Sequence, residues 1–132
     1  MRSERGQSLV ELSLTLPLLL ILLVGVAEVG NAINAYVTVV DAGRDGARLG
    51  SRGVASDNEI KGLVLTEMGR LPGSVDQDND ITVEHDVVPV PEHPSIRVTV
   101  CYDHPLILGL TLVMPDPLRM CSSSTMPTVD GS

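Results

Sequence analysis

The chain has 132 residues, a formal net charge of -8 and 43% hydrophobic residues. This length accommodates at most one small domain beside an N-terminal apolar segment, and it excludes a large enzyme. The chain has no Trp, no Phe and two Tyr, so its core must be built from Leu, Val and Ile. An excess of 17 acidic over 9 basic side chains, with so few rings, argues against a nucleic-acid surface.

A polar leader and a long apolar stretch open the chain. Residues 1–6 carry Arg2 and Arg5, and no charged residue occurs from Leu12 to Ala27. With its apolar neighbours, this stretch approaches the roughly 20 residues that span a bilayer. The leader arginines favour a cytoplasmic N-terminus by the positive-inside rule. We therefore expect a single-pass protein of the cytoplasmic membrane, with its C-terminal part extracytoplasmic.

The helical pattern continues beyond Ala27 without a break signal. It predicts one helix from about Ser8 to about Gly50, apolar at first and amphipathic later. Pro17 lies inside this helix and predicts a kink. One face of the second half is polar, with Glu28, Asn31, Thr38, Asp41, Asp45, Arg48 and Arg52, and an opposing apolar stripe has Val29, Ile33, Val37, Val40 and Ala47.

Small residues crowd the last turns of this helix. A glycine costs about 1 kcal/mol relative to alanine in a helix interior, so three of them need a reason. Small residues four positions apart let another backbone come close, whereas a fraying helix end would explain them as well. Both interpretations stay open for Ala42, Gly43, Gly46, Ala47 and Gly50.

A second helix and several strands are expected in the C-terminal part. Ser56 and Glu59 form a capping box that opens an amphipathic helix. Alternating side chains predict strands at Ile81–Val87 and Ile96–Tyr102, and a last strand at about Leu118–Ser124. The apolar run 106–114 fits a strand or a short helix equally. The expected fold class is α+β: a long transmembrane-to-amphipathic helix, then a small extracytoplasmic domain with a short helix and an antiparallel sheet. The boundaries are a leader at 1–6, the helix at 7–53 and the domain at 54–132.

Two cysteines, Cys101 and Cys121, lie in the C-terminal part. If the apolar segment delivers this part across a membrane, the compartment permits a disulfide, which would stabilise the domain by roughly 3 kcal/mol in the chain-entropy model. The alternative is two free thiols. Their spacing matches no metal-binding pattern.

No metal, cofactor or catalytic site is expected. Three alternate carboxylates resemble the start of a calcium loop, but Ile81 stands where that motif needs Gly and Val87 where it needs Glu. The three histidines match no standard zinc spacing. No Gly-x-Ser-x-Gly, phosphate loop or Cys-His arrangement with an orienting group occurs, so the sequence gives no support to an enzyme. The carboxylates are Asp76, Asp78 and Asp80, and the histidines are His85, His93 and His104.

The first 50 residues carry a family resemblance. The motifs are Arg5-Gly6-Gln7-Ser8-Leu9-Val10-Glu11-Leu12, then Leu16-Pro17-Leu18-Leu19-Leu20, and later Gly46-Ala47-Arg48. They resemble the TadE-like family, small pilin-like proteins associated with the tight-adherence (Flp) pilus, a branch of the type IV pilus systems.

The resemblance implies processing and assembly. A prepilin peptidase in the membrane would cut after Gly6, making Gln7 the new N-terminus and Glu11 the fifth residue of the mature chain. Glu11 would then pair with the ammonium group of Gln7 in a neighbouring subunit. The implied partners are the membrane, other pilin-like subunits, the prepilin peptidase and the pilus secretion machinery. Major pilins of this family are usually much shorter, which favours a minor pilin or an assembly partner.

Two alternatives remain open from the sequence. The chain could be an unprocessed, membrane-anchored extracytoplasmic protein without a pilus role. It could also be a secreted protein with an ordinary signal peptide, because Gly25-Val26-Ala27 offers a small-x-small site before Glu28. Glu11 inside the apolar segment and the helical pattern that continues past Ala27 both count against the signal peptide.

Overall fold

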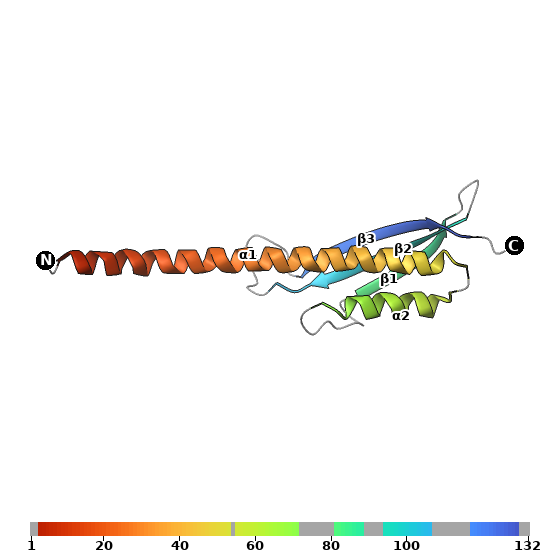
Figure 1. The fold of residues 1–132 in the computed structure, drawn as a ribbon, viewed down its shortest axis with the longest axis horizontal. Helices are drawn as coiled ribbons and strands as arrows, with labels where there is room; N and C mark the ends of the chain where they lie inside the picture. The colour runs from red at the N-terminus through yellow and green to blue at the C-terminus, as the bar shows by residue number, and fades with distance from the viewer. Residues whose placement is uncertain (1–2, 54, 72–80, 89–93, 107–116, 130–132) are drawn as a thin grey trace.

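The computed structural model describes residues 3–53, 55–71, 81–88, 94–106 and 117–129. In chain order the elements are α1 (Ser3–Gly50), α2 (Asp57–Met68), β1 (Ile81–Val88), β2 (Ser95–His104) and β3 (Leu118–Pro127). Figure 1 shows α1 as a long rod, with the sheet and α2 gathered along its C-terminal half. The predicted α+β arrangement is confirmed.

Helix α1 has 48 residues, which corresponds to about 72 Å of helix. It begins at Ser3, earlier than the predicted start at Ser8, and it ends at Gly50 as predicted. The helix continues through Pro17, and Figure 1 shows no sharp bend there, so the predicted kink is not seen. After the last turn, Gly53 has a φ of 72°, a left-handed conformation that glycine adopts without strain and that turns the chain toward α2.

Helix α2 begins with the predicted capping box. Ser56 is the N-cap, and its backbone N–H donates to Oε2 of Glu59 at 2.7 Å. The Ser56 hydroxyl lies 2.9 Å from the same oxygen. Because these hydrogen bonds favour the charged carboxylate, they hold the pKa of Glu59 below its ordinary value, the backbone bond being the larger cause.

The three strands form an antiparallel meander in the order β1-β2-β3. Ile81 of β1 is opposite Tyr102 of β2, and Cys101 of β2 is opposite Cys121 of β3. The strand predictions are confirmed, and the strands extend one to three residues beyond the predicted ends. Most of the undecided apolar run 106–114 lies outside the described residues.

The core lies between one face of the sheet and the two helices. Alternate residues of β2 point into it, because successive side chains of a strand point to opposite faces. Helix α1 packs on β2 and β3, while α2 packs beside α1. The opposite face of the sheet is polar among the described residues, with side chains such as Glu84, Arg97 and Ser123 exposed. The buried apolar residues are Ala35, Val39, Ala42, Ala47, Ile60, Val64, Met68, Leu71, Ile81, Ile96, Val98, Val100, Tyr102 and Met120.

Candidate functional site

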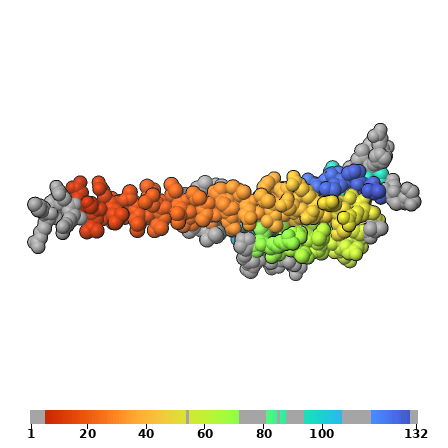
Figure 2. Space-filling model, viewed as in Figure 1, coloured from red at the N-terminus to blue at the C-terminus, as the bar shows by residue number. Residues whose placement is uncertain are grey.

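The N-terminal half of α1 is a bare apolar helix. From Gly6 to Leu23 every residue is exposed, and the helix that contains these residues is long and apolar enough to cross a membrane. Figure 2 shows it projecting from the domain as a rod one helix wide. The chain's own domain therefore does not bury these leucines, and they form an extended exposed apolar surface.

The predicted processing residues lie at the exposed beginning of this rod. A Cβ added at Gly6 would meet nothing within 4 Å, so the backbone around the predicted cut is open to approach. Gln7 and Glu11 are exposed as well, and they lie four positions apart, hence on one face of the helix. Thr15 donates its hydroxyl to the backbone carbonyl of Glu11, so this hydrogen bond does not involve the Glu11 carboxylate.

The small residues of α1 pack closely, but against this chain. A Cβ at Gly46 would lie 2.9 Å from Cγ2 of Val64 on α2 and 3.3 Å from Cγ1 of Val98 on β2. A Cβ at Gly50 would clash with Cδ1 of Ile96. Close packing therefore explains the small residues, and a fraying helix end does not. The buried members of the set are Ala42, Gly43, Gly46, Ala47 and Gly50.

The predicted faces of the second half of α1 need correction. Val29 and Ile33, from the expected apolar stripe, are 54% and 59% exposed, whereas Glu28, from the expected polar face, is 7% exposed. The face that packs on the sheet is made instead of Ala35, Val39 and the small residues that follow. The physical reason is the short distance between α1 and the sheet. Small side chains on the packed face allow this distance, and the larger aliphatic side chains lie on the exposed side of the helix.

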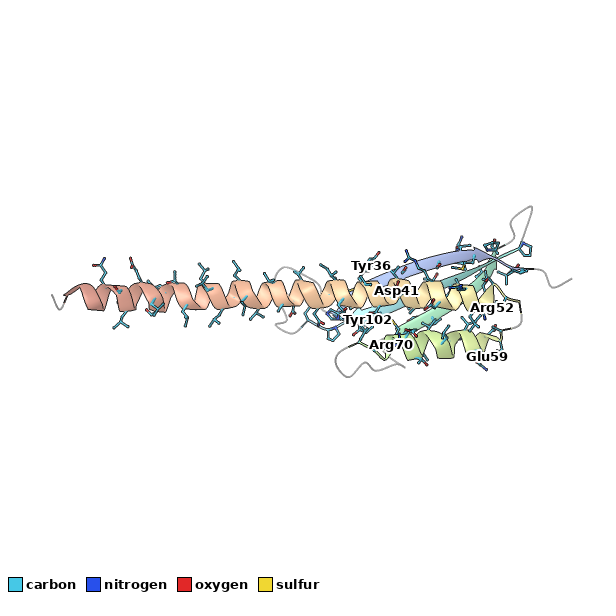
Figure 3. The ribbon with its side chains drawn as sticks, in the orientation of Figure 1. Tyr36, Asp41, Arg52, Glu59, Arg70 and Tyr102 are labelled. Atoms are coloured by element: carbon cyan, nitrogen blue, oxygen red, sulfur yellow. A yellow bond between two sulfur atoms is a disulfide. The ribbon has the colours of Figure 1, made fainter. Side chains whose placement is uncertain are left out.

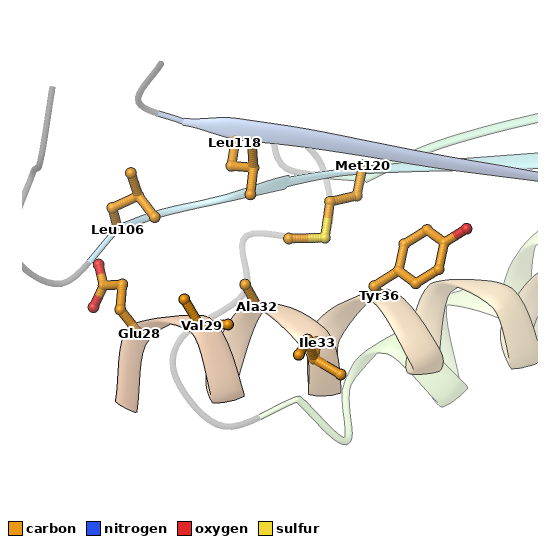
Figure 4. A pocket seen from close by; sticks show the side chains of 8 residues that line it. All are labelled: Glu28, Val29, Ala32, Ile33, Tyr36, Leu106, Leu118 and Met120. Atoms are coloured by element: carbon orange, nitrogen blue, oxygen red, sulfur yellow. The ribbon is translucent and has the colours of Figure 1, made fainter. Parts of the chain in front are cut away.

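The exposed Val29 and Ile33 border an apolar groove. The groove has a volume of about 280 Å³ and lies where the domain first covers α1. Figure 4 shows Leu106 next to the carboxylate of Glu28, with Leu118 and Met120 of β3 facing α1. Sequence analysis missed this site, although a second apolar sector on the helix was a visible signal. The lining residues are Glu28, Val29, Ala32, Ile33, Tyr36, Leu106, Leu118 and Met120.

Residues 6–48 match the family profile described as TadE-like protein. The chain carries a TadE-like segment. The match confirms the resemblance drawn from the motifs around Gly6, Glu11 and Gly46. No curated protein and no solved structure compared with the chain matches it.

The TadE-like segment coincides with α1 and ends two residues before it. It therefore includes the bare rod, one wall of the apolar groove and most of the small residues that hold the domain. The short helix and the sheet lie outside the match. The TadE-like match thus describes the helix and does not extend to the domain.

The sheet outside the TadE-like segment is cross-linked. Cys101 and Cys121, which are direct cross-strand partners, form a disulfide with a Cα–Cα distance of 4.1 Å. The bond joins the ends of β2 and β3 that flank residues 105–117. It therefore ties the end of β2 to the beginning of β3.

The weaker metal candidates can be placed only in part. Asp76, Asp78, Asp80 and His93 lie outside the described residues, as does the side chain of His85. His104 is buried, and its ring centroid lies 5.8 Å from that of Tyr102. Across the described ranges, no three His, Cys, Asp or Glu side chains are arranged to hold a metal ion. His104 belongs to the packing of the sheet.

Proposed function

We propose that the chain is a structural, non-enzymatic, pilin-like component of a tight-adherence pilus, a minor pilin or an assembly partner. Helix α1 inserts into the cytoplasmic membrane with the N-terminus inside and the domain outside. The observation that supports this most is the TadE-like match on a helix whose first half has no covering from its own chain. Such a helix offers a continuous apolar surface to other pilin-like helices.

We further propose that prepilin peptidase cuts after Gly6. Removal of residues 1–6 takes away Arg2 and Arg5, the two charges that hold the helix to the cytoplasmic side. It also creates an ammonium group on Gln7. The processed helix has less to resist its extraction from the membrane during assembly.

Glu11 is the proposed intersubunit contact. An acid near the end of a membrane helix is costly unless it has a partner, and the ammonium of Gln7 in a neighbouring subunit supplies the opposite charge. A pair of this kind also sets the axial offset between neighbouring helices, because only one offset brings the two charges together.

The experiment compares Glu11→Ala with Ser13→Ala, a second exposed polar site two residues away. The Ser13 hydroxyl donates to the carbonyl of Val10 within its own helix, so its loss removes no contact with a neighbour. We expect Glu11→Ala to insert and to be cleaved normally but to be depleted from purified pili, while Ser13→Ala is incorporated like the wild type. Equal incorporation of both variants would mean that Glu11 makes no contact needed for assembly, which would contradict the proposed contact.

A further inference from the structure

The outward surface of α1 is uncharged over more than the thickness of a bilayer core. Between Leu12 and Val40 the one charged side chain is Glu28, and the fold buries it against the domain. The 29 residues of this run correspond to about 43 Å of helix, roughly 13 Å more than the hydrocarbon core of a membrane. Hydrocarbon, headgroup and interfacial regions together measure about 40–45 Å, which matches the whole run.

The apolar groove lies at the outer end of this run. Val29 and Ile33 line it from α1, and Leu118 and Met120 line it from β3. These side chains continue the surface of the bare rod without a charged interruption, since Glu28 is directed toward Leu106. A surface that is already in contact with lipid below the groove therefore extends into it.

Two polar side chains of α1 near the groove, those of Tyr36 and Thr38, are compatible with a membrane interface. Tyr36 is 50% exposed at the groove, and a tyrosine places an apolar ring and a polar hydroxyl at headgroup depth. Thr38, on another side of the helix, donates its hydroxyl to the carbonyl of Asn34 at 3.0 Å, which reduces the cost of placing it near lipid. The first exposed charge on the helix after Glu11 is Asp41, one turn beyond Val37. Figure 3 places Asp41 farther from the N-terminus than Tyr36.

We propose that the outer leaflet of the bilayer covers this groove, so that the domain sits in the membrane interface instead of standing above it. Lipid acyl chains contact Val29, Ile33 and Leu118, and the hydroxyl of Tyr36 lies among the headgroups. The buried position of Glu28 is then the device that keeps a carboxylate out of lipid at this depth. The inference rests on the membrane insertion contained in the proposed function, and it does not depend on incorporation into a pilus.

The natural absence of Trp allows a direct test. Four single-Trp variants of the full chain are reconstituted in phosphatidylethanolamine and phosphatidylglycerol vesicles with acyl chains brominated near the headgroup. Ile33→Trp and Tyr36→Trp report on the groove. Leu19→Trp reports on the membrane segment, and Arg52→Trp, two residues beyond the C-terminal end of α1, reports on water. Retention of the Cys101–Cys121 disulfide and of protease resistance shows that each variant is folded.

We expect bromolipid to quench the two groove reporters nearly as strongly as Leu19→Trp, and to leave Arg52→Trp unquenched. Groove reporters that behave like Arg52→Trp would overturn the inference. Blue-shifted emission without quenching would also overturn it, because a protein surface such as a second copy would then cover the groove. If Leu19→Trp itself is not quenched, the membrane insertion of the proposed function fails too, which separates the two failures.

Discussion

The two halves of α1 are built on the same backbone geometry but receive their burial from different sources. In the first half, large leucines such as Leu20 are exposed along the whole circumference of the helix. In the second half, alanines and glycines face α2 and β2, and Ala42 and Ala47 are fully buried. The composition of each half fits its surroundings: small side chains occur where the sheet packs closely on the helix, and large ones occur in the half that is proposed to contact lipid or other helices.

The two halves of α1 therefore have different roles. The covered half owes its position to packing inside the chain, so it forms a fixed mount for the domain. The bare half gains nothing from the domain, and burying each of its leucines stabilises only an inserted or assembled state, by about 1.5–3 kcal/mol per side chain. Substitutions in the two halves should therefore affect different measurements.

The largest expected effect comes from truncating one large aliphatic side chain in the packed domain and one in the bare half of α1. Ile60 is 1% exposed on α2, and Ile60→Ala should lower the free energy of unfolding of the domain by about 2–5 kcal/mol through the cavity it leaves. Leu20→Ala should leave that free energy unchanged. Pulse proteolysis in urea with the protein in detergent measures both. An equal loss in the two variants would show that the packed domain and the bare half of α1 are not independent.

Removal of the disulfide should destabilise the domain by roughly 3 kcal/mol in the chain-entropy model. The double variant Cys101→Ser, Cys121→Ser tests this without a free thiol, and the same proteolysis assay reports the result. Membrane insertion of α1 should be unaffected, because the bond lies wholly within the sheet. Loss of insertion in this variant would contradict the separation of the two halves.

Replacing glycine by alanine should change the stability of the domain in opposite directions at two positions. Gly46→Ala places a Cβ within 3 Å of Val64 and should destabilise the domain by about 1–3 kcal/mol through overpacking. Gly62→Ala on α2 meets nothing within 4 Å and should stabilise it by about 0.5–1 kcal/mol through helix propensity. Stabilisation by both would mean that α1 does not approach the sheet as closely as described.

The smallest expected effect is a pH dependence at the start of α2. Hydrogen bonds from Ser56 lower the pKa of Glu59, so the carboxylate contributes stability at pH values above its unfolded pKa. This contribution is lost as the pH falls through the lowered folded pKa. Glu59→Gln should therefore remove part of the acid destabilisation of the domain, as measured by thermal unfolding between neutral pH and pH values well below that of an ordinary carboxyl. An unchanged acid profile would mean that the capping box does not persist in solution.

Local signals were sufficient to predict most elements of the domain. The capping box at Ser56 and Glu59 is contained in four residues, and the alternation at Ile96–Tyr102 is contained in one strand. Each signal depends on near neighbours in the sequence. For Cys101 and Cys121 the sequence predicted a disulfide and left free thiols as the alternative, because the pairing of β2 with β3 is a tertiary feature.

The packed face of α1 could not be predicted from hydrophobicity. A pattern search selects the large apolar residues Val29, Ile33 and Val37, whereas the fold selects the small ones that admit the sheet. Glu28 is buried at the level of Leu106, which is 78 positions away in the sequence. Neither the partner nor its approach distance is encoded in the local periodicity of the helix.

The N-terminal residue of the mature chain tests the central claim most directly. Intact-mass and peptide mass spectrometry of the chain purified from its native membrane should find Gln7 as the first residue, because the bare half of α1 is proposed to be a processed pilin-like helix. Met1 would indicate an unprocessed anchor. Glu28 as the first residue would contradict the account, since the bare half of α1 would then be a discarded signal peptide.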